Sequence, residues 1–348
     1  MKKLVIALAL SALCGGTVFA AEPVDPGKAP VKIIFDTDMF TDYDDIGALA
    51  MLHTLADQGK AQILATVTSS RDNWSVAAVE IVNRYYGRAD LPVGSPKGIG
   101  MSGFPKEHLV LYSDFIKSYE GWYKHINSGD APDATEVYRK VLAAQPDDSV
   151  VLCTVGFMTN IRKLLESKGD AISPLDGKAL VAKKVRYWVT MACAYPKGRE
   201  YNSMSDWQSS SIAFDQFPKP IIFTDFQYGI GVLSGRAVSE KKYPTRNPVH
   251  DMFKHALPSR QAVREGKAAQ KSEQGQFSWD ETAVLAAICG TGKYFGTQRG
   301  RYKMVGDKGD NEWIDDPQGT HYRLIETMPR ESVGKLIDDL IAVGTTVK

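Results

Sequence analysis

The chain has 348 residues and nearly balanced charge, with 42 Lys and Arg side chains against 41 Asp and Glu. Nothing in this balance favours nucleic-acid binding, which requires a basic face. The length allows one large domain or two ordinary ones, and we predict a single domain over residues 21–348.

Residues 1–20 have the pattern of a secretory signal peptide. Lys2 and Lys3 precede an apolar stretch from Leu4 to Leu13, and Val18-Phe19-Ala20 is a small-x-small cleavage site. The apolar stretch is too short to span a bilayer, and no later run reaches the roughly 18 apolar residues of a membrane span. We therefore expect a periplasmic or secreted protein that does not contact the membrane after signal cleavage.

Apolar runs of strand length alternate with helical patterns along the chain. The strand candidates are residues 31–36, 62–68, 149–155, 185–191 and 220–225. The helix candidates are residues 45–57, 74–86, 135–144, 159–167 and 206–217, with later ones at 282–288 and 332–343. Most of these strands are almost continuously apolar or β-branched, as strands buried on both faces are. The order predicts an α/β fold with an open, mostly parallel, Rossmann-like sheet and helices on both faces.

Two segments and three cysteines fall outside this pattern. Residues 94–130 and 236–279 are rich in Gly, Pro, Lys and aromatics, and we interpret them as insertions near one edge of the sheet. Cys153, Cys193 and Cys289 are odd in number and lack CxxC spacing. They indicate buried thiols rather than a zinc site or a disulfide framework.

Five aspartates lie between positions 36 and 45, directly after the first predicted strand. Asp44 and Asp45 open a helix, where negative charge is favourable. That explanation does not cover Asp36 and Asp38, which end a buried strand. Crowded carboxylates raise one another's pKa values unless a cation neutralises them, and a hard divalent cation prefers oxygen ligands. Because Gly47 stands where an EF-hand needs glutamate, that motif is excluded.

The acidic segment resembles the signature of the nucleoside hydrolases, which cleave N-ribosidic bonds with a bound Ca²⁺. The matching residues are Asp36-Thr37-Asp38, then Asp44-Asp45 and an apolar helix. The stretch Met39–Tyr43 is longer than in that signature, and Asp42 within it has no counterpart. The resemblance implies that Asp38 and Asp45 bind Ca²⁺ and that Asp38 is the catalytic base. It also implies that Asp44 binds the sugar and that Asp36 braces the turn.

Four later segments, each after a predicted strand, extend the resemblance over about residues 31–290. They imply that the Val155 carbonyl and Asp280 complete the Ca²⁺ site. They also imply sugar contacts from Asn73, Glu200, Asn202 and Asp280. A further ribose-binding asparagine of the family falls near Ala194 here and is missing. The implied partner is a small nucleoside, and homo-oligomers are common in the family.

Several of these residues also have a local structural interpretation. Asn73 could cap the helix that follows it. Thr159 and Asn160 could form a turn and a cap. Ser278 and Glu281 have the spacing of a capping box.

The side of the site that would hold the leaving base is the least determined by sequence. Purine-accepting relatives have histidine immediately before the last aspartate, whereas this chain has Trp279. Other candidates for this side are Tyr228, His250 and His255, with Arg246 and the Trp122-Tyr123 pair.

Two other functions remain open at this point. A haloacid-dehalogenase-like, Mg²⁺-dependent phosphatase also has Asp-x-Asp after its first strand, and Gly306–Asp310 resembles its late Mg²⁺ loop. Phe40, two positions after Asp38, argues against it. The other alternative is an exported nucleoside- or sugar-binding protein without turnover, which Trp279 and the missing asparagine favour.

Overall fold

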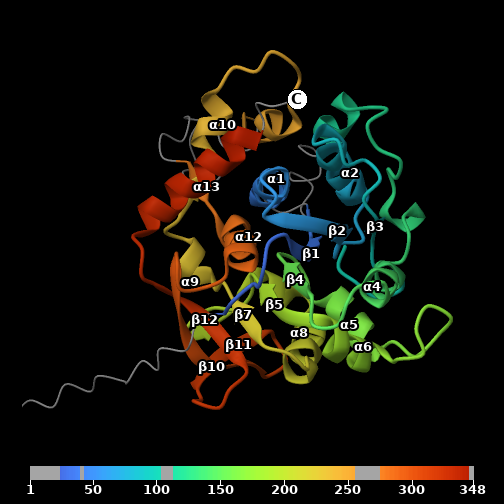
Figure 1. Cartoon of the computed structure of the whole chain (residues 1–348), viewed down its shortest axis with the longest axis vertical. Coiled ribbons are helices and arrows are strands. Elements are labelled where there is room, and N and C mark those ends of the chain that lie inside the picture. Colours follow the sequence, from blue (N-terminus) through green and yellow to red (C-terminus); the bar gives the residue numbers. More distant parts are fainter. Residues whose placement is uncertain (1–23, 40–42, 103–112, 255–274, 345–348) are drawn as a thin grey trace, which may run out of the picture.

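The computed structural model describes residues 24–39, 43–102, 113–254 and 275–344 (Figure 1). The predicted signal peptide, Asp42 and His255 lie outside the described residues. Among the helices in those four ranges, none is both long and apolar enough to cross a membrane.

All five predicted strands form and lie side by side in parallel. They are β1 (Val31–Thr37), β2 (Ala61–Thr68), β4 (Val150–Thr154), β5 (Val185–Thr190) and β7 (Ile221–Phe223). With β3 (Val93–Gly94) at one edge and β6 (Lys197–Gly198) at the other, the strand order of the sheet is β3-β2-β1-β4-β5-β7-β12-β10-β11-β6. In this order β10 is Phe295–Val305, β11 is Asp310–Asp315 and β12 is His321–Glu326. The predicted mostly parallel, open sheet is confirmed.

Helices cover both faces of this sheet (Figure 1). Those that begin and end within one residue of prediction are α1 (Asp44–Asp57), α2 (Ser75–Tyr85), α4 (Ala134–Ala143), α5 (Thr159–Glu166) and α8 (Trp207–Gln216). Within the described residues, the other helices of eight residues or more are α6 (Gly177–Lys184), α12 (Trp279–Cys289) and α13 (Arg330–Gly344). On β1, Ile33 and Phe35 face the core built with α1, α2, α12 and α13, whereas Ile34 faces the core built with α4, α5, α6 and α8. Because helices cover both faces of the sheet, the central strands are apolar almost throughout their length.

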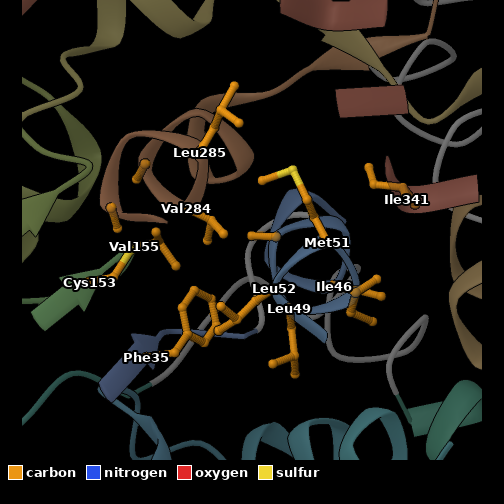
Figure 2. Close-up of a cluster of buried hydrophobic side chains, with 14 of the residues drawn as sticks. Phe35, Ile46, Leu49, Met51, Leu52, Cys153, Val155, Val284, Leu285 and Ile341 are labelled. Carbon is orange, nitrogen blue, oxygen red and sulfur yellow. The ribbon is translucent and has the colours of Figure 1, made fainter. Parts of the chain in front are cut away.

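Helix α1 is buried from Asp44 to Leu55. Figure 2 shows Leu49 and Leu52 of α1 among Phe35 of β1 and Val284 of α12. At Gly47 the packing is so close that a Cβ would lie 2.2 Å from the Glu281 carboxylate. A helix enclosed in this way carries its N-terminal carboxylates into the interior of the protein.

Three antiparallel strands near the C-terminus were not predicted. They are β10 (Phe295–Val305), β11 (Asp310–Asp315) and β12 (His321–Glu326), and β12 joins the sheet parallel to β7. Only one face of β10 is fully covered, so the exposed Arg301 and Lys303 alternate with buried residues. The strand therefore lacks the continuous apolar run by which the other strands were predicted. Short elements were also missed: β6 (Lys197–Gly198), α7 (Tyr201–Ser205), α9 (Phe226–Gly229), β8 (Leu233–Ser234), α10 (Arg236–Glu240), β9 (Gln276–Phe277) and a 3₁₀ turn at Ser128–Asp130.

The two proposed insertions differ in position. Ser95 bridges to Asp133 beside the edge strand β3, so residues 94–130 adjoin a sheet edge as expected. The described part of 236–279 does not, because α10 packs on α13 and Phe253 reaches Gly47 of α1. That prediction was wrong for the second segment, which covers helices rather than a strand edge.

His321 provides a test of the β12 packing. Its Nδ1 accepts the Tyr302 N–H at 3.0 Å, and burial lowers its pKa to about 4. The unfolded chain binds this proton more tightly, so the free energy of unfolding should fall as pH drops from about 6.5 towards 4, by up to about 3 kcal/mol. His321→Gln should flatten this part of the profile in urea unfolding measured at several pH values. Equal slopes in both proteins would contradict the assignment.

Candidate active site

Four carboxylates meet at the carboxyl end of β1. Asp38 directly follows the strand, Asp44 and Asp45 lie in the first turn of α1, and Asp280 lies in the first turn of α12. All four are at most 4% exposed. One carboxylate oxygen from each of Asp44, Asp45 and Asp280 lies within 4.8 Å of the others.

The turn after β1 fixes the Asp45 carboxylate. The hydroxyl of Thr37 donates to Asp45 Oδ1, and the Met39 N–H donates to the same oxygen at 3.1 Å. Met39 has a φ of 45°, a left-handed conformation that non-glycine residues rarely adopt. Asp45 Oδ2 and Asp44 Oδ1 are buried and have no hydrogen-bond partner in the part of the chain that the structure describes.

Burial and like charge raise the pKa values throughout this cluster. Burial raises the pKa of Asp45 to about 6. The pKa values of Asp44 and Asp280 rise well above their ordinary range, by burial first and then by the neighbouring carboxylates. Backbone N–H groups of Trp279 and Asp280 at the N-terminus of α12 partly offset this for Asp44. Crowded oxygen donors with unsatisfied buried atoms fit a hard divalent cation.

Asp36 lies behind the cluster and accepts hydrogen bonds from two helices. Tyr138 of α4 donates to Asp36 Oδ2 at 2.8 Å, and Asn160 of α5 donates to it at 3.1 Å and to the Thr68 carbonyl at 2.9 Å. Burial raises the pKa of Asp36 to about 7. These contacts suit the bracing role inferred for Asp36. They also give Asn160 a role other than the predicted cap, since α5 has no side-chain cap.

The segment after β4 packs tightly against Asp38. The Val155 N–H donates to the Asp36 carbonyl at 2.7 Å, and the Phe157 N–H donates to Ser69 Oγ at 2.9 Å. A Cβ on Gly156 would lie 2.4 Å from both the Asp38 nitrogen and Ser69 Oγ. The candidate carbonyl ligand Val155 is thus held next to the acidic turn.

Glu200 and Asn202 lie in the long loop between β5 and α8, where Glu200 is the N-cap of the short helix α7 and Asn202 lies in that helix. Asn202 Nδ2 donates to the Val155 carbonyl at 3.3 Å and to the Met191 carbonyl at 3.1 Å. The Glu200 carboxylate accepts the backbone N–H groups of Cys193, Asn202 and Ser203 at 2.7–3.1 Å. Asn202 therefore contacts a candidate cation ligand, whereas Glu200 holds the loop together.

Asn73 is exposed and is not part of the buried cluster. It does not cap α2, whose N-cap is Trp74 in a left-handed conformation without a side-chain cap. Its loop does border the site, because the charges of Asp38 and Asp72 both contribute to the raised pKa of Tyr201, after burial. Tyr201 is 44% exposed and was not predicted as a site residue.

Three residues that contribute to the site were not predicted, although each has a signal in the sequence. Tyr138 could have been found as the polar-tipped member of the buried face of α4. Ser69 follows β2 directly, the same position relative to its strand that Asp38 has after β1. Thr37 already stands within the acidic motif.

Two leaving-group candidates are engaged in packing. Trp279 donates its indole N–H to the Phe226 carbonyl at 3.1 Å and stacks on the Phe226 ring. Tyr228 is 2% exposed and packs edge-on against Phe295 in the core. These contacts argue against a direct role for either side chain towards a base. His250 Nδ1 lies 3.1 Å from Asp251 Oδ1, so this side chain is engaged by the carboxylate of its neighbour.

Solved structures share this architecture. A plant nucleoside hydrolase aligns with a TM-score of 0.68 at 15% identity, over 90% of this chain and 99% of that one. The inosine-uridine preferring nucleoside hydrolase of Bacillus anthracis aligns with a TM-score of 0.66 at 13% identity, over 90% and 99%. The type III effector XopQ, solved with adenosine diphosphate ribose, aligns with a TM-score of 0.67 at 14% identity, over 92% and 96%. The chain has the nucleoside hydrolase fold.

Comparison of the sequence alone does not identify this fold. No protein-family model matches the chain, and no curated protein matches it. The likeness to the nucleoside hydrolases is therefore one of three-dimensional structure, at 13–15% identity in the structures above.

Within the nucleoside hydrolase fold, the segment that resembled a phosphatase Mg²⁺ loop has another role. Residues 306–309 form the turn between the antiparallel strands β10 and β11, and Asp307 is exposed. Asp310 pairs with Arg199 at 2.9 Å. This segment is therefore a hairpin turn and not a phosphatase loop after a parallel strand. That removes one of the two motifs that supported the phosphatase alternative.

Glu281 is a buried carboxyl beside the cluster. It does not form the predicted capping box, since both of its oxygens lack a hydrogen-bond partner among the described residues and the Ser278 N–H donates to the Val232 carbonyl. Burial and then the charge of Asp44 raise its pKa well above the ordinary range.

Removing this carboxyl should stabilise the cation-free protein. We expect Glu281→Met to raise the free energy of unfolding in EDTA by about 1–3 kcal/mol, because a buried polar group without a partner is lost while volume is kept. Chemical unfolding at pH 8 measures the change. Glu136→Met, at a half-exposed side chain, is the control and should change stability little. A destabilised Glu281→Met protein would show that the carboxyl has a favourable partner.

Proposed function

We propose that this protein hydrolyses the N-glycosidic bond of ribonucleosides or related N-ribosides, with Ca²⁺ as cofactor. The observation that carries the proposal is the buried cluster of Asp44, Asp45 and Asp280 beside Asp38. Two of its oxygens, Asp44 Oδ1 and Asp45 Oδ2, lack partners in the described ranges. The solved nucleoside hydrolases of the same fold support the reaction class.

Each residue of the site has a proposed task. Asp38, Asp45, Asp280 and the Val155 carbonyl would hold the cation. A bound divalent cation lowers the pKa of water and attracts sugar hydroxyls. Asp38 would accept the proton of the attacking water, and Asp44 and Asn202 would orient the ribose as positive charge develops on it. Glu200 would act by holding the Asn202 loop.

Incubation with purine and pyrimidine ribonucleosides tests the reaction. We expect release of free base that requires Ca²⁺ and is abolished by EDTA. ADP-ribose belongs in the ligand set, because XopQ was solved with it. Binding of ribosides without base release would favour a non-catalytic binding protein. Mg²⁺-dependent release of phosphate from an ester would favour the phosphatase.

We also propose that the protein is exported and acts outside the cytoplasm on small molecules. Cleavage after Ala20 should give a mature protein that begins at Ala21, which intact mass measurement of periplasmic and secreted fractions would detect. We further propose that the mature protein forms a homo-oligomer, which light scattering would test. A full-length mass in the cell fraction would contradict export.

A further inference from the structure

The hairpin of β10 and β11 docks on the loop that carries Glu200 and Asn202. Its strand β11 pairs antiparallel with β6, which places Asn311 opposite Gly198. The Trp313 N–H donates to the Pro196 carbonyl at 2.7 Å. Near the hairpin turn, a Cβ on Gly309 would lie 2.7 Å from Met204 Cα. The hairpin therefore contacts both the beginning and the end of this loop.

Asn311 forms the most specific of these contacts. Its Oδ1 accepts the Ala194 N–H at 2.9 Å, and its Nδ2 donates to the Ala194 carbonyl at 2.7 Å. Asn311 is 1% exposed and Ala194 is 4% exposed. An apolar side chain at 311 would leave both backbone groups of Ala194 buried without these partners, which is costly.

Ala194 is directly connected to the sugar side of the proposed site. The N–H of the preceding residue, Cys193, donates to the Glu200 carboxylate at 3.1 Å. The same carboxylate accepts the Asn202 N–H at 2.7 Å, and the Asn202 side chain contacts the Val155 carbonyl. A displacement of Ala194 would therefore also displace the Glu200 carboxylate and, with it, Asn202.

Resting on the proposed hydrolysis, we infer that Asn311 is a positioning residue for the sugar-binding loop. It holds Ala194 so that Glu200 and Asn202 keep their places. The carboxylates of the cation site come from other elements, β1, α1 and α12. Asn311 therefore acts on sugar binding and turnover, and much less on cation binding.

The substitution Asn311→Leu tests this role. We expect kcat/KM for ribonucleosides to fall by about 10- to 100-fold, as for a reacting group misplaced by about an ångström. We expect the Ca²⁺ concentration that gives half of the thermal shift to change by less than about threefold, because the proposed carboxylate ligands lie on other elements and only the Val155 carbonyl contacts Asn202. Hydrogen exchange should become faster for the amides of residues 193–203, with the rest of the sheet unchanged.

Two variants serve as controls. Asp310→Ala removes the exposed pair with Arg199 from the same hairpin and should leave both kinetics and exchange unchanged. Asn311→Asp keeps an acceptor for the Ala194 N–H but places a carboxylate oxygen against the Ala194 carbonyl. We therefore expect a loss in kcat/KM between those of Asp310→Ala and Asn311→Leu. If Asn311→Leu does not fold, the kcat/KM and hydrogen exchange of Asn311→Asp test the inference in its place.

Unchanged kcat/KM or unchanged exchange at residues 193–203 would overturn the inference. A wild-type protein that binds ribose or ADP-ribose without hydrolysing nucleosides would refute only the proposed reaction. In that case weaker riboside binding by Asn311→Leu supports the inference, and equal binding overturns it.

Discussion

Asp280→Asn is expected to lower kcat/KM for ribonucleoside hydrolysis by about 10³-fold or more. The substitution keeps the shape of the side chain but removes one of three carboxylates whose oxygens lie within 4.8 Å of one another. A loss of about 4 kcal/mol of transition-state stabilisation gives this factor. A loss of this size is expected for a group that is proposed both to bind the cation and to contact the sugar. Base release at saturating Ca²⁺ measures the change.

The same variant should be more stable than wild type when the cation is removed. Burial first, and then the charges of Asp44 and Asp45, raise the pKa of Asp280, so a neutral amide removes the cost of an ionised carboxylate at this position. Thermal unfolding should show a higher Tm in EDTA and a smaller rise on adding Ca²⁺. Asp339→Asn, at a solvent-exposed pair with Lys335, is the control for both measurements. A wild-type Ca²⁺ response in Asp280→Asn would remove Asp280 from the cation site.

Gly156→Ala should disrupt the site although position 156 carries no side chain. The added Cβ would lie 2.4 Å from the Asp38 nitrogen and from Ser69 Oγ, so the backbone after β1 must move. We expect a loss of about 1–3 kcal/mol in stability and about 10- to 100-fold in kcat/KM. Urea unfolding and steady-state kinetics measure the two effects.

Gly129→Ala is the matched control for this prediction. Nothing lies within 4 Å of a Cβ at Gly129, so neither stability nor activity should change appreciably. A Gly156→Ala protein that retains full activity would show that the Asp38 turn tolerates displacement.

The strands that are covered on both faces could be predicted from the sequence. Val31–Thr37 and Val150–Thr154 are buried almost throughout, and such runs are visible without any partner. The acidic cluster could be predicted because Asp36 and Asp38 end a buried strand, where unpaired charge needs a cation. Strand β10 was missed because its exposed face carries charges at Arg301 and Lys303.

Contacts between distant segments could not be predicted from local patterns. Ser278 and Glu281 have the spacing of a capping box, yet Glu281 instead lies against Gly47 of α1. Nothing near Asn311 indicates that its amide meets Ala194, 117 residues earlier. Glu200 was correctly placed after β5, but its use as a backbone acceptor depends on how the loop closes on itself.

The enclosure of α1 by α12 and α13 has a consequence for how the protein folds. The helix that presents Asp44 and Asp45 packs mainly on segments that are synthesised near the end of the chain. Contacts of such sequence separation form slowly, because the intervening chain must first be ordered. The proposed cation site can therefore assemble only after nearly the whole polypeptide has been made. Under the proposed export, a chain translocated before that point would complete the site outside the cytoplasm.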